Sequence, residues 1–268
     1  MRVRFWGVRG SVPWATAGSI GHGCNTPCVE VSDDDRRELL VLDAGSGIVG
    51  LGEALGSDPR AVPILLTHYH WDHLQGLPFF APLYKLGWAP VIWAPALRDV
   101  DPAWVERIFQ SPFFPVPYAQ LPAPPAVKIV SPGALRIRGF ELHALPLNHP
   151  GGALAYRVAG TRGDLVYATD HEFGDARFDE PLAAFCAGAR AVVFDAHFTP
   201  DERATHRGWG HSDWQSCAEF AARAGVERLW LFHHKPGRTD VELTEIEAAA
   251  RRIHPGAEAA GEGDTFEI

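Results

Sequence analysis

The sequence predicts an α/β protein that folds as a single domain over residues 1–268. Short apolar runs of strand length recur along the chain, and turn residues bound most of them. Helix start and stop signals stand between several of these runs. With 46% hydrophobic residues, the chain can bury a sizeable core. Each half reads as strands followed by helices, so one domain fits the pattern better than two independent ones.

The first 66 residues read as strands joined by turns. The expected strands are 3–8, 27–31, 38–42 and 61–66. The charged stretch 32–37 is expected to be a solvated turn, and a short helix is expected to end near Gly56. The run 61–66 is apolar throughout and is therefore expected to be buried.

The interval 78–130 is rich in proline and aromatic residues. A helix is expected to begin at Asp101-Pro102 and to run through Ile108. Six prolines between 111 and 125 exclude long regular structure there.

Strands and helices follow in the second half of the chain. The expected strands are 135–137, 140–144, 153–158, 164–168, 191–194 and 228–232. A short helix is expected at 181–187. Ser212 and Gln215 predict a capping box for a helix that ends at Gly225, and Thr239 with Glu242 predicts another for the last helix.

One short stretch carries most of the chemical signal. Thr67-His68-Tyr69-His70-Trp71-Asp72-His73 directly follows the buried strand, at the sheet rim where α/β proteins place their sites. His68 and His70 are two residues apart, so in an extended segment their side chains leave on the same side and can chelate one ion. Asp72 and His73 follow as the chain turns, so their side chains are offset toward the position of a second ion. Imidazole with carboxylate suits zinc, iron or manganese.

The motif His68-x-His70-x-Asp72-His73 resembles the signature of the metallo-β-lactamase superfamily of binuclear metallohydrolases. The similarity extends over nearly the whole chain and is closest to the phosphodiesterase and ribonuclease Z-like branch. It implies an αββα sandwich with a metal pair at one edge, and 265–268 is then expected to complete the second sheet. It also implies a cap-like insertion around 78–130, which we expect to be a hydrophobic lid because its charges nearly balance.

The resemblance further implies which residues hold two divalent ions. Zinc is expected first, with manganese or iron as alternatives. One ion would be held by His68, His70 and His149, the other by Asp72, His73 and His233, and Asp170 would bridge the two.

Other polar residues surround this ligand set. Asp43 and Asp195 are expected to support the ligand loops by hydrogen bonds, although a plain turn aspartate explains Asp43 equally well. His211 stands just before a helix N-terminus, where free N–H groups favour an anion. In the resembled branch a histidine here contacts the phosphate or donates a proton, and a structural histidine beside a cap is the alternative. The residues expected outside the ligand set are His22, His171, Glu172, His197 and His234.

The implied chemistry is hydrolysis of a phosphodiester. Two cations about 3.5–4 Å apart can share a hydroxide, which would attack phosphorus in line. Four positive charges less two carboxylates and one hydroxide leave a centre of about +1, which complements the transition state of this reaction. Asp72 and His211 are the expected catalytic residues, with His211 binding the substrate and stabilising or protonating the leaving oxygen. The aromatic residues that could stack on a base, although packing explains most of them, are Tyr69, Trp71, Phe113, Phe114 and Trp209.

Cyclic nucleotides or related small phosphodiesters are the favoured substrates. Processing of tRNA 3′ ends uses the same ligands but is opposed by the acidic composition and the lack of a basic arm. Carbonyl hydrolysis, as in lactonases or thioesterases, would leave His211 with little to do. A non-enzymatic metal-binding regulator or electron-transfer partner is opposed by the complete ligand set.

The composition limits which binding partners and which cellular compartment we expect. A net charge of −9 argues against a large nucleic-acid surface. The four cysteines are too scattered for a disulfide framework, which favours free thiols in a reducing compartment. No signal-type apolar region opens the chain, and no stretch approaches the roughly 20 apolar residues of a membrane span. We therefore expect a cytoplasmic enzyme with a small phosphodiester substrate and no membrane partner.

Overall fold

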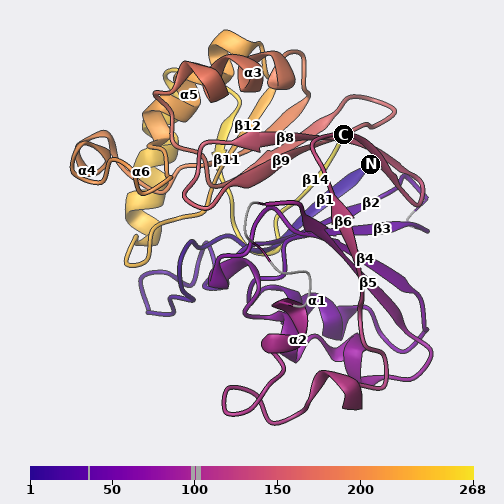
Figure 1. Cartoon of the computed structure of the whole chain (residues 1–268). Helices are drawn as coiled ribbons and strands as arrows, with labels where there is room; N and C mark the ends of the chain where they lie inside the picture. Colours follow the sequence, from indigo (N-terminus) through magenta and orange to yellow (C-terminus); the bar gives the residue numbers. More distant parts are fainter. Residues whose placement is uncertain (36, 98–99, 101–103) are drawn as a thin grey trace.

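Two seven-stranded sheets form the centre of the molecule, and helices lie on the outer side of each (Figure 1). This computed structural model describes residues 1–35, 37–97, 100 and 104–268. The layers run helix, sheet, sheet, helix, so the expected αββα sandwich is confirmed. The two chain ends lie together, because the α-amino group of Met1 donates a hydrogen bond to the carbonyl oxygen of Ile268 (2.8 Å).

The first sheet has the order β14-β1-β2-β3-β4-β5-β6. Its strands are β1 (Arg2–Gly7), β2 (Cys28–Ser32), β3 (Leu39–Leu42), β4 (Ala61–Leu65), β5 (Ala89–Pro95), β6 (Ala126–Val130) and β14 (Thr265–Glu267). The strands from β3 to β6 run parallel. The prediction that the closing strand completes the second sheet is wrong, because β14 pairs antiparallel with β1. Side-chain alternation identifies a strand but does not specify its partner.

The second sheet has the order β13-β12-β11-β10-β9-β8-β7. Its strands are β7 (Gly133–Ile137), β8 (Phe140–Leu147), β9 (Ala153–Val158), β10 (Leu165–Ala168), β11 (Ala191–Asp195), β12 (Arg228–Phe232) and β13 (Ala257–Ala259). The strands from β10 to β13 run parallel. Every residue of β11 is buried, as expected for a strand covered on both faces.

The core has three apolar layers. The central layer lies between the sheets, where Phe5 of β1, Tyr167 of β10 and Phe232 of β12 pack ring against ring. A second layer joins the first sheet to α1 (Ile48–Ala54) and the segment after β4. The third joins the second sheet to helices of the C-terminal half. The sheets are therefore fixed by burial on both faces, which holds their strand ends in place.

Helices of the second half cover the second sheet. They are α3 (Ala176–Cys186), α5 (Trp214–Ala224) and α6 (Asp240–Arg251), whereas α4 (Pro200–Thr205) buries no residue and stands apart from the sheet at the left of Figure 1. The capping box of Thr239 and Glu242 on α6 is confirmed. Two predicted helix starts are wrong. The N-cap of α3 is Asp175, well before Pro181, and that of α5 is Asp213, whose carboxylate accepts a hydrogen bond from the Ser216 N–H.

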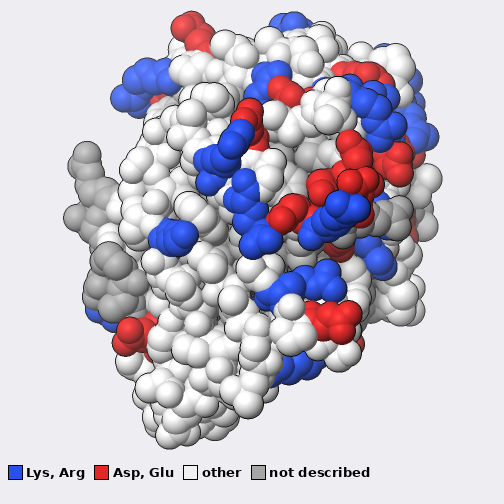
Figure 2. Space-filling model, turned by 90° about the vertical axis from the view of Figure 1, so that its right-hand side faces the viewer, with Lys and Arg blue, Asp and Glu red and all other residues white. Residues whose placement is uncertain are grey.

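The interval 78–130 is not insertion throughout, because it supplies β5 and β6 to the first sheet. The predicted helix start at Asp101-Pro102 lies outside the described residues, and the helix itself is α2 (Trp104–Arg107). Between 111 and 125 the regular structure consists of one 3-10 turn, Tyr118–Gln120. On the face shown in Figure 2, charges of both signs are interspersed in the upper part, and the lower part is largely uncharged.

Two expectations from composition can be compared with the structure. Among the helices of the described residues, none has the length and apolar character required to cross a bilayer. The four cysteines are free thiols, and Cys24 alone is only partly buried.

Candidate metal centre

Seven potential ligand residues meet at one edge of the sandwich. Parallel strands place their carboxyl ends at the same edge of a sheet, so the residues that follow several strands are brought together. His68 to His73 follow β4, His149 follows β8, Asp170 follows β10, and His233 follows β12. These segments are far apart in the sequence, and the two sheets together make them neighbours.

His68, His70 and His149 form one potential metal-binding group, with their ligand atoms within 4.8 Å of one another. Nε2 of His149 lies 2.9 Å from Nδ1 of His70. His68 and His149 are buried, while His70 is exposed, so this group opens toward solvent on the His70 side.

Asp72, His73 and His233 form the second group. Oδ2 of Asp72 lies 3.1 Å from Nε2 of His233 and 3.5 Å from Nε2 of His73. All three side chains are buried. This group therefore lies deeper than the first.

Asp170 stands between the two groups. Its Oδ2 lies 3.2 Å from Nε2 of His73, and its Oδ1 lies 3.5 Å from Nε2 of His233. The same Oδ1 is 3.9 Å from Nε2 of both His68 and His149. One carboxylate thus faces both sets of nitrogens, which is the position expected for a bridging ligand.

The donor atoms fit divalent cations. The buried Nε2 atoms of His68 and His73 have no hydrogen-bond partner in the protein, an unusual state for a buried polar atom. Burial lowers the pKa of His149 to about 4, which keeps its imidazole neutral with a lone pair available. Burial alone would raise the pKa of Asp72 and Asp170, but the surrounding histidines, among them His73 and His233, hold both pKa values below the usual range. The neutral imidazole of His149 and the ionised carboxylates are donors that zinc prefers in catalytic sites. Burial alone would lower the pKa of His73, but Asp170, Asp72 and Asp43 raise it well above the usual range, so this imidazole must lose a proton when a metal binds.

Asp43, directly after β3, supports the deeper group from behind. This fully buried carboxylate accepts hydrogen bonds from the backbone N–H of Thr67 (2.8 Å) and the hydroxyl of Tyr167 (2.8 Å). It also lies 2.9 Å from Nδ1 of His73. A proton held on that Nδ1 leaves the Nε2 of His73 free to bind a metal.

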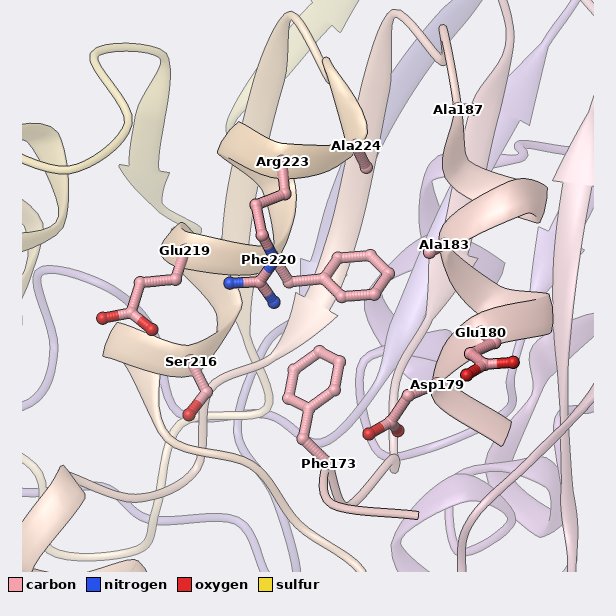
Figure 3. A pocket seen from close by; sticks show the side chains of 10 residues that line it. All are labelled: Phe173, Asp179, Glu180, Ala183, Ala187, Ser216, Glu219, Phe220, Arg223 and Ala224. Atoms are coloured by element: carbon pink, nitrogen blue, oxygen red, sulfur yellow. The ribbon is translucent and has the colours of Figure 1, made fainter. Parts of the chain in front are cut away.

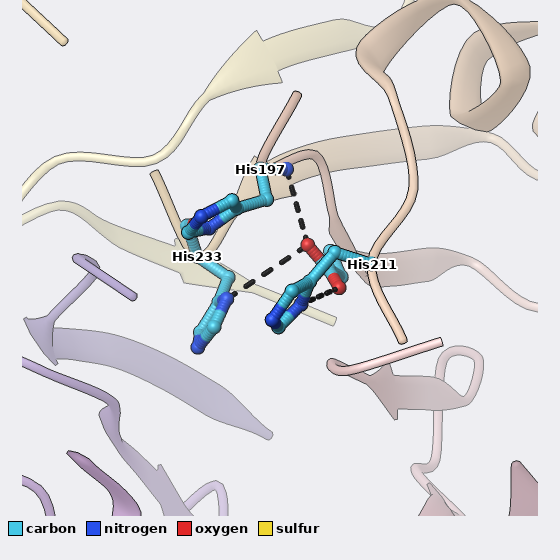
Figure 4. A group of neighbouring side chains, drawn as sticks. His197, His211 and His233 are labelled. Atoms are coloured by element: carbon cyan, nitrogen blue, oxygen red, sulfur yellow. Dashed lines mark hydrogen bonds and ion pairs between the residues drawn. The ribbon is translucent and has the colours of Figure 1, made fainter. Parts of the chain in front are cut away.

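Asp195, the last residue of β11, supports the opposite side. Its Oδ2 lies 2.8 Å from Nδ1 of His211, and its Oδ1 accepts a hydrogen bond from the backbone N–H of His197. The same Oδ1 is 3.8 Å from Nδ1 of His233. The dashed lines in Figure 4 mark these three contacts, in which His211 and His233 use their rings and His197 uses its backbone N–H.

His211 lies at the rim of the cluster, with Nδ1 3.7 Å from Oδ1 of Asp170. Burial by itself would lower the pKa of His211, but the charges of Asp195 and Asp170 outweigh it and raise the pKa to about 9. The imidazole is therefore protonated near neutral pH in the metal-free protein. Ser212 does not cap the helix that follows, because its hydroxyl donates a hydrogen bond to the carbonyl oxygen of His171.

One contact to the cluster was not expected from the sequence. The backbone N–H of Ser11 donates a hydrogen bond to Oδ2 of Asp72 (2.7 Å). Ser11 has a φ of +63°, and three further non-glycine residues of this site share such values, Asp43, Asp170 and His233. Positive φ in non-glycine residues concentrates at functional sites. The sequence carries no signal for it at Ser11.

The remaining histidines have other partners. His22 bonds Asp240, His171 bonds Asp179, and His234 bonds the carbonyl oxygen of Ala260. His197 is buried and stacks on the ring of His211 (centroids 4.5 Å apart), so it packs against the cluster.

A separate cavity of about 410 Å³ lies between α3 and α5, and none of the clustered histidines lines it (Figure 3). The rings of Phe173 and Phe220 face it, and its charged side chains include Asp179, Glu219 and Arg223. It has no imidazole or thiol ligand, so the metal-binding chemistry belongs to the cluster at the strand ends.

Comparisons with known proteins agree with this fold. Residues 39–234 match the model of the beta-lactamase superfamily domain. The ribonuclease Z of Bradyrhizobium sp. (strain ORS 278) is 28% identical, over 98% of this chain and 98% of that protein. Among solved structures, the metallo-β-lactamase fold protein YhfI of Bacillus subtilis superposes with a TM-score of 0.75 at 19% identity, over 99% of each chain. A diphosphatase of the PhnP family gives 0.73 at 20% identity, over 100% of this chain and 98% of that one.

These relatives bear on the expected partners. A protein named ribonuclease Z matches this chain over nearly its full length, so the expectation that a nucleic-acid partner is unlikely is not supported. A phosphodiester substrate is consistent with both kinds of relative.

Proposed function

Since this chain belongs to the beta-lactamase superfamily and is a hydrolase of the metallo-β-lactamase fold, we propose that it is a metal-dependent phosphodiesterase acting on small phosphodiesters such as cyclic nucleotides. The seven clustered residues are the proposed ligands of two divalent ions, zinc in the first place. When bound, such ions supply an activated water and positive charge for the phosphoryl oxygens.

The observation that carries the proposal is the position of His211 and its pairing with Asp195. Its imidazole is paired with Asp195 at 2.8 Å and stands at the rim of the cluster, where a leaving group would depart. An alkoxide leaving group needs a proton, and a protonated imidazole can provide it. The leaving group of an activated ester or lactone depends less on such a proton donor. The site therefore suits phosphodiesters better than carbonyl substrates.

Other residues of the chain hold the proposed ligands in position. Asp43 orients His73, and the Ser11 N–H fixes one oxygen of Asp72. Asp195 keeps the His211 ring at one orientation while its proton is transferred. Such support limits the movement of each group between turnovers.

The test is a hydrolysis screen of the zinc- or manganese-loaded protein on bis-p-nitrophenyl phosphate, cyclic nucleotides, a tRNA precursor and a lactone. We expect turnover of the diesters that a chelator abolishes and added metal restores. His211→Ala should lower the turnover of cyclic nucleotides, whose alkoxide leaving group needs a proton, about 10²-fold with metal content intact, and should lower that of bis-p-nitrophenyl phosphate less, because p-nitrophenolate leaves without a proton. The matched control is His143→Ala, which removes an exposed imidazole on β8. Unchanged turnover in His211→Ala would remove the reason for preferring phosphodiesters.

Cleavage of tRNA precursors is the second candidate, because the ribonuclease Z relative matches almost the whole chain. The net charge of −9 and the nearly balanced charges of the interval 78–130 weigh against a long RNA partner. Efficient cleavage of the tRNA precursor in the same screen, with little turnover of cyclic nucleotides, would reverse this order.

A further inference from the structure

The loop between α4 and His211 holds an indole exposed beside the metal cluster. Trp209 lies between Gly208 and Gly210, whose φ values are +83° and +85°. Its side chain is 62% exposed. A single exposed apolar side chain is common on protein surfaces, so what distinguishes Trp209 is the way its loop is held.

Glu172 fixes the backbone on both sides of Trp209. Its carboxylate accepts a hydrogen bond from the Gly208 N–H, 2.9 Å from each oxygen, and another from the Gly210 N–H at 2.8 Å. Glu172 follows Asp170 by two residues. The carboxylate thus ties the Trp209 loop to the segment that carries the proposed bridging ligand.

The same loop rests directly on another proposed ligand. The carbonyl oxygen of Gly210 lies 2.9 Å from Nδ1 of His149. A Cβ atom at Gly210 would lie 2.2 Å from that nitrogen, so only glycine permits this approach. Trp209 is therefore anchored one residue away from a ring of the cluster.

The indole ring has a fixed neighbour as well. It meets the ring of His206 nearly at a right angle (82°), with centroids 4.9 Å apart. His206 in turn stacks on Phe198, which packs against His211 at 6.0 Å. Two rings, those of His206 and Phe198, therefore connect the indole to the ring of His211.

The other aromatic residues named from the sequence are less suited to this role. Tyr69 bonds the carbonyl oxygen of Pro95 and packs on Trp104. Phe114 packs against Phe79 and Phe109. The rings of these two residues are used within the protein. Trp71 and Phe113, 57% and 87% exposed, share the exposure of Trp209, but of the three it is the Trp209 loop that Glu172 holds.

We propose that Trp209 stacks on the base of the substrate and that Glu172 is the positioning residue that holds it there. This inference rests on the proposed phosphodiesterase function and narrows its substrate class to phosphodiesters that carry a nucleobase. The flat indole suits any of the bases, because each has a π face. Simple alkyl or sugar phosphodiesters would gain nothing from this contact.

The test compares two substrates with the same leaving group, thymidine 5′-p-nitrophenyl phosphate and methyl p-nitrophenyl phosphate. In Trp209→Ala, we expect the ratio of their kcat/KM values to fall about tenfold, mainly through a higher KM for the thymidine substrate. Trp209→Phe should restore part of the ratio, and Trp209→Leu, which keeps an apolar side chain without a π face, should not. The matched control is Leu86→Ala, because Leu86 is 81% exposed and precedes β5, at the strand ends opposite the site.

Glu172→Ala tests the positioning role. In the wild-type background, it should lower the ratio of the two kcat/KM values. In the Trp209→Ala background, it should change this ratio less than twofold, because both substitutions remove the same stacking contact with the base. An unchanged ratio in Trp209→Ala and Trp209→Leu would overturn the stacking role. Full additivity of the two substitutions would overturn the role of Glu172.

A wild-type protein that hydrolyses neither diester would refute the proposed function without deciding this inference. Calorimetric binding of thymidine 5′-monophosphate and methyl phosphate to the zinc-loaded protein then decides it. We expect a Trp209-dependent preference of about tenfold for the nucleotide. Equal dissociation constants in wild type and Trp209→Ala would overturn the inference.

Discussion

The two halves of the molecule support the cluster in parallel ways, each with a buried aspartate at the end of a strand. Asp43 follows β3 and supports His73, which follows the neighbouring parallel strand β4. Asp195 ends β11 and faces His233, which follows the neighbouring parallel strand β12. In both halves, a carboxylate behind the cluster faces the Nδ1 of a proposed ligand whose Nε2 points into it.

The two halves differ in which groups form hydrogen bonds with each carboxylate. Asp43 bonds His73 directly at 2.9 Å and also receives the hydroxyls of Thr67 and Tyr167, all within the interior. Asp195 lies 3.8 Å from His233 and makes its short side-chain contact with His211, at the rim. The carboxylate of the N-terminal half thus supports a proposed metal ligand alone, and that of the C-terminal half also holds the proposed proton donor, His211.

The largest expected effect of breaking this pattern is at Asp195. Asp195→Asn removes the charge that orients and protonates His211, so kcat should fall about 10²-fold with metal content little changed. The measurement is steady-state turnover of a cyclic nucleotide, whose alkoxide leaving group needs a proton, with metal analysis. Asp58→Asn, at an exposed position, is the control. A variant that loses its metal but keeps full turnover per bound metal would contradict the comparison.

The pH profile of the same variant sharpens this prediction. A proton donor is active while protonated, so the rate should fall as pH rises through the pKa of His211. That pKa is raised to about 9 in the metal-free protein, and bound cations repel the proton, so the alkaline limb should lie at or below pH 9. Loss of the Asp195 charge should move the limb to lower pH. A limb that stays in place would show that another group donates the proton.

An intermediate effect is expected at Asp43. Asp43→Asn places an amide opposite the Nδ1 of His73 and weakens the orientation of that ring, so metal affinity should fall about 10- to 100-fold. Competition with a chromophoric chelator measures it. Turnover at saturating metal should recover much of the wild-type value, in contrast to Asp195→Asn. The opposite outcome, with intact affinity and low turnover, would mean that the two aspartates have the same role.

The smallest effect is expected at Tyr167, whose hydroxyl reaches from the second sheet to Asp43 in the first. Tyr167→Phe keeps the ring in the core and removes one hydrogen bond, so the free energy of unfolding should fall by about 1 kcal/mol. Denaturant unfolding measures this loss. The activity should stay within a few-fold of wild type, because Asp43 retains its contact with His73. A loss of several kcal/mol would show that this bond, rather than the apolar core, joins the sheets.

Part of the fold was readable from local patterns. The run 61–66 is apolar and the pair Thr239 and Glu242 is a complete capping box, so a buried strand and a helix start follow from nearest neighbours alone. The helix predicted at 181–187 begins too late, because Pro181 lies inside α3 and Asp175 accepts the hydrogen bond of the cap. The cap of α5 was misplaced by one residue, because Ser212 and Asp213 are both good caps and a tertiary contact with His171 occupies the serine.

The sequence by itself determined the ligand chemistry, because His68, His70, Asp72 and His73 stand together in one turn and the type of a donor atom does not depend on the fold. The resemblance carried by that turn added His149, Asp170 and His233. The tertiary structure decided what lies behind and beside these residues. Asp43 and Tyr167 meet across two sheets, Ser11 reaches Asp72 from the first loop, and Glu172 holds the loop of Trp209. Such contacts join residues with no fixed sequence spacing, and only the packing of the two sheets determines which of them meet.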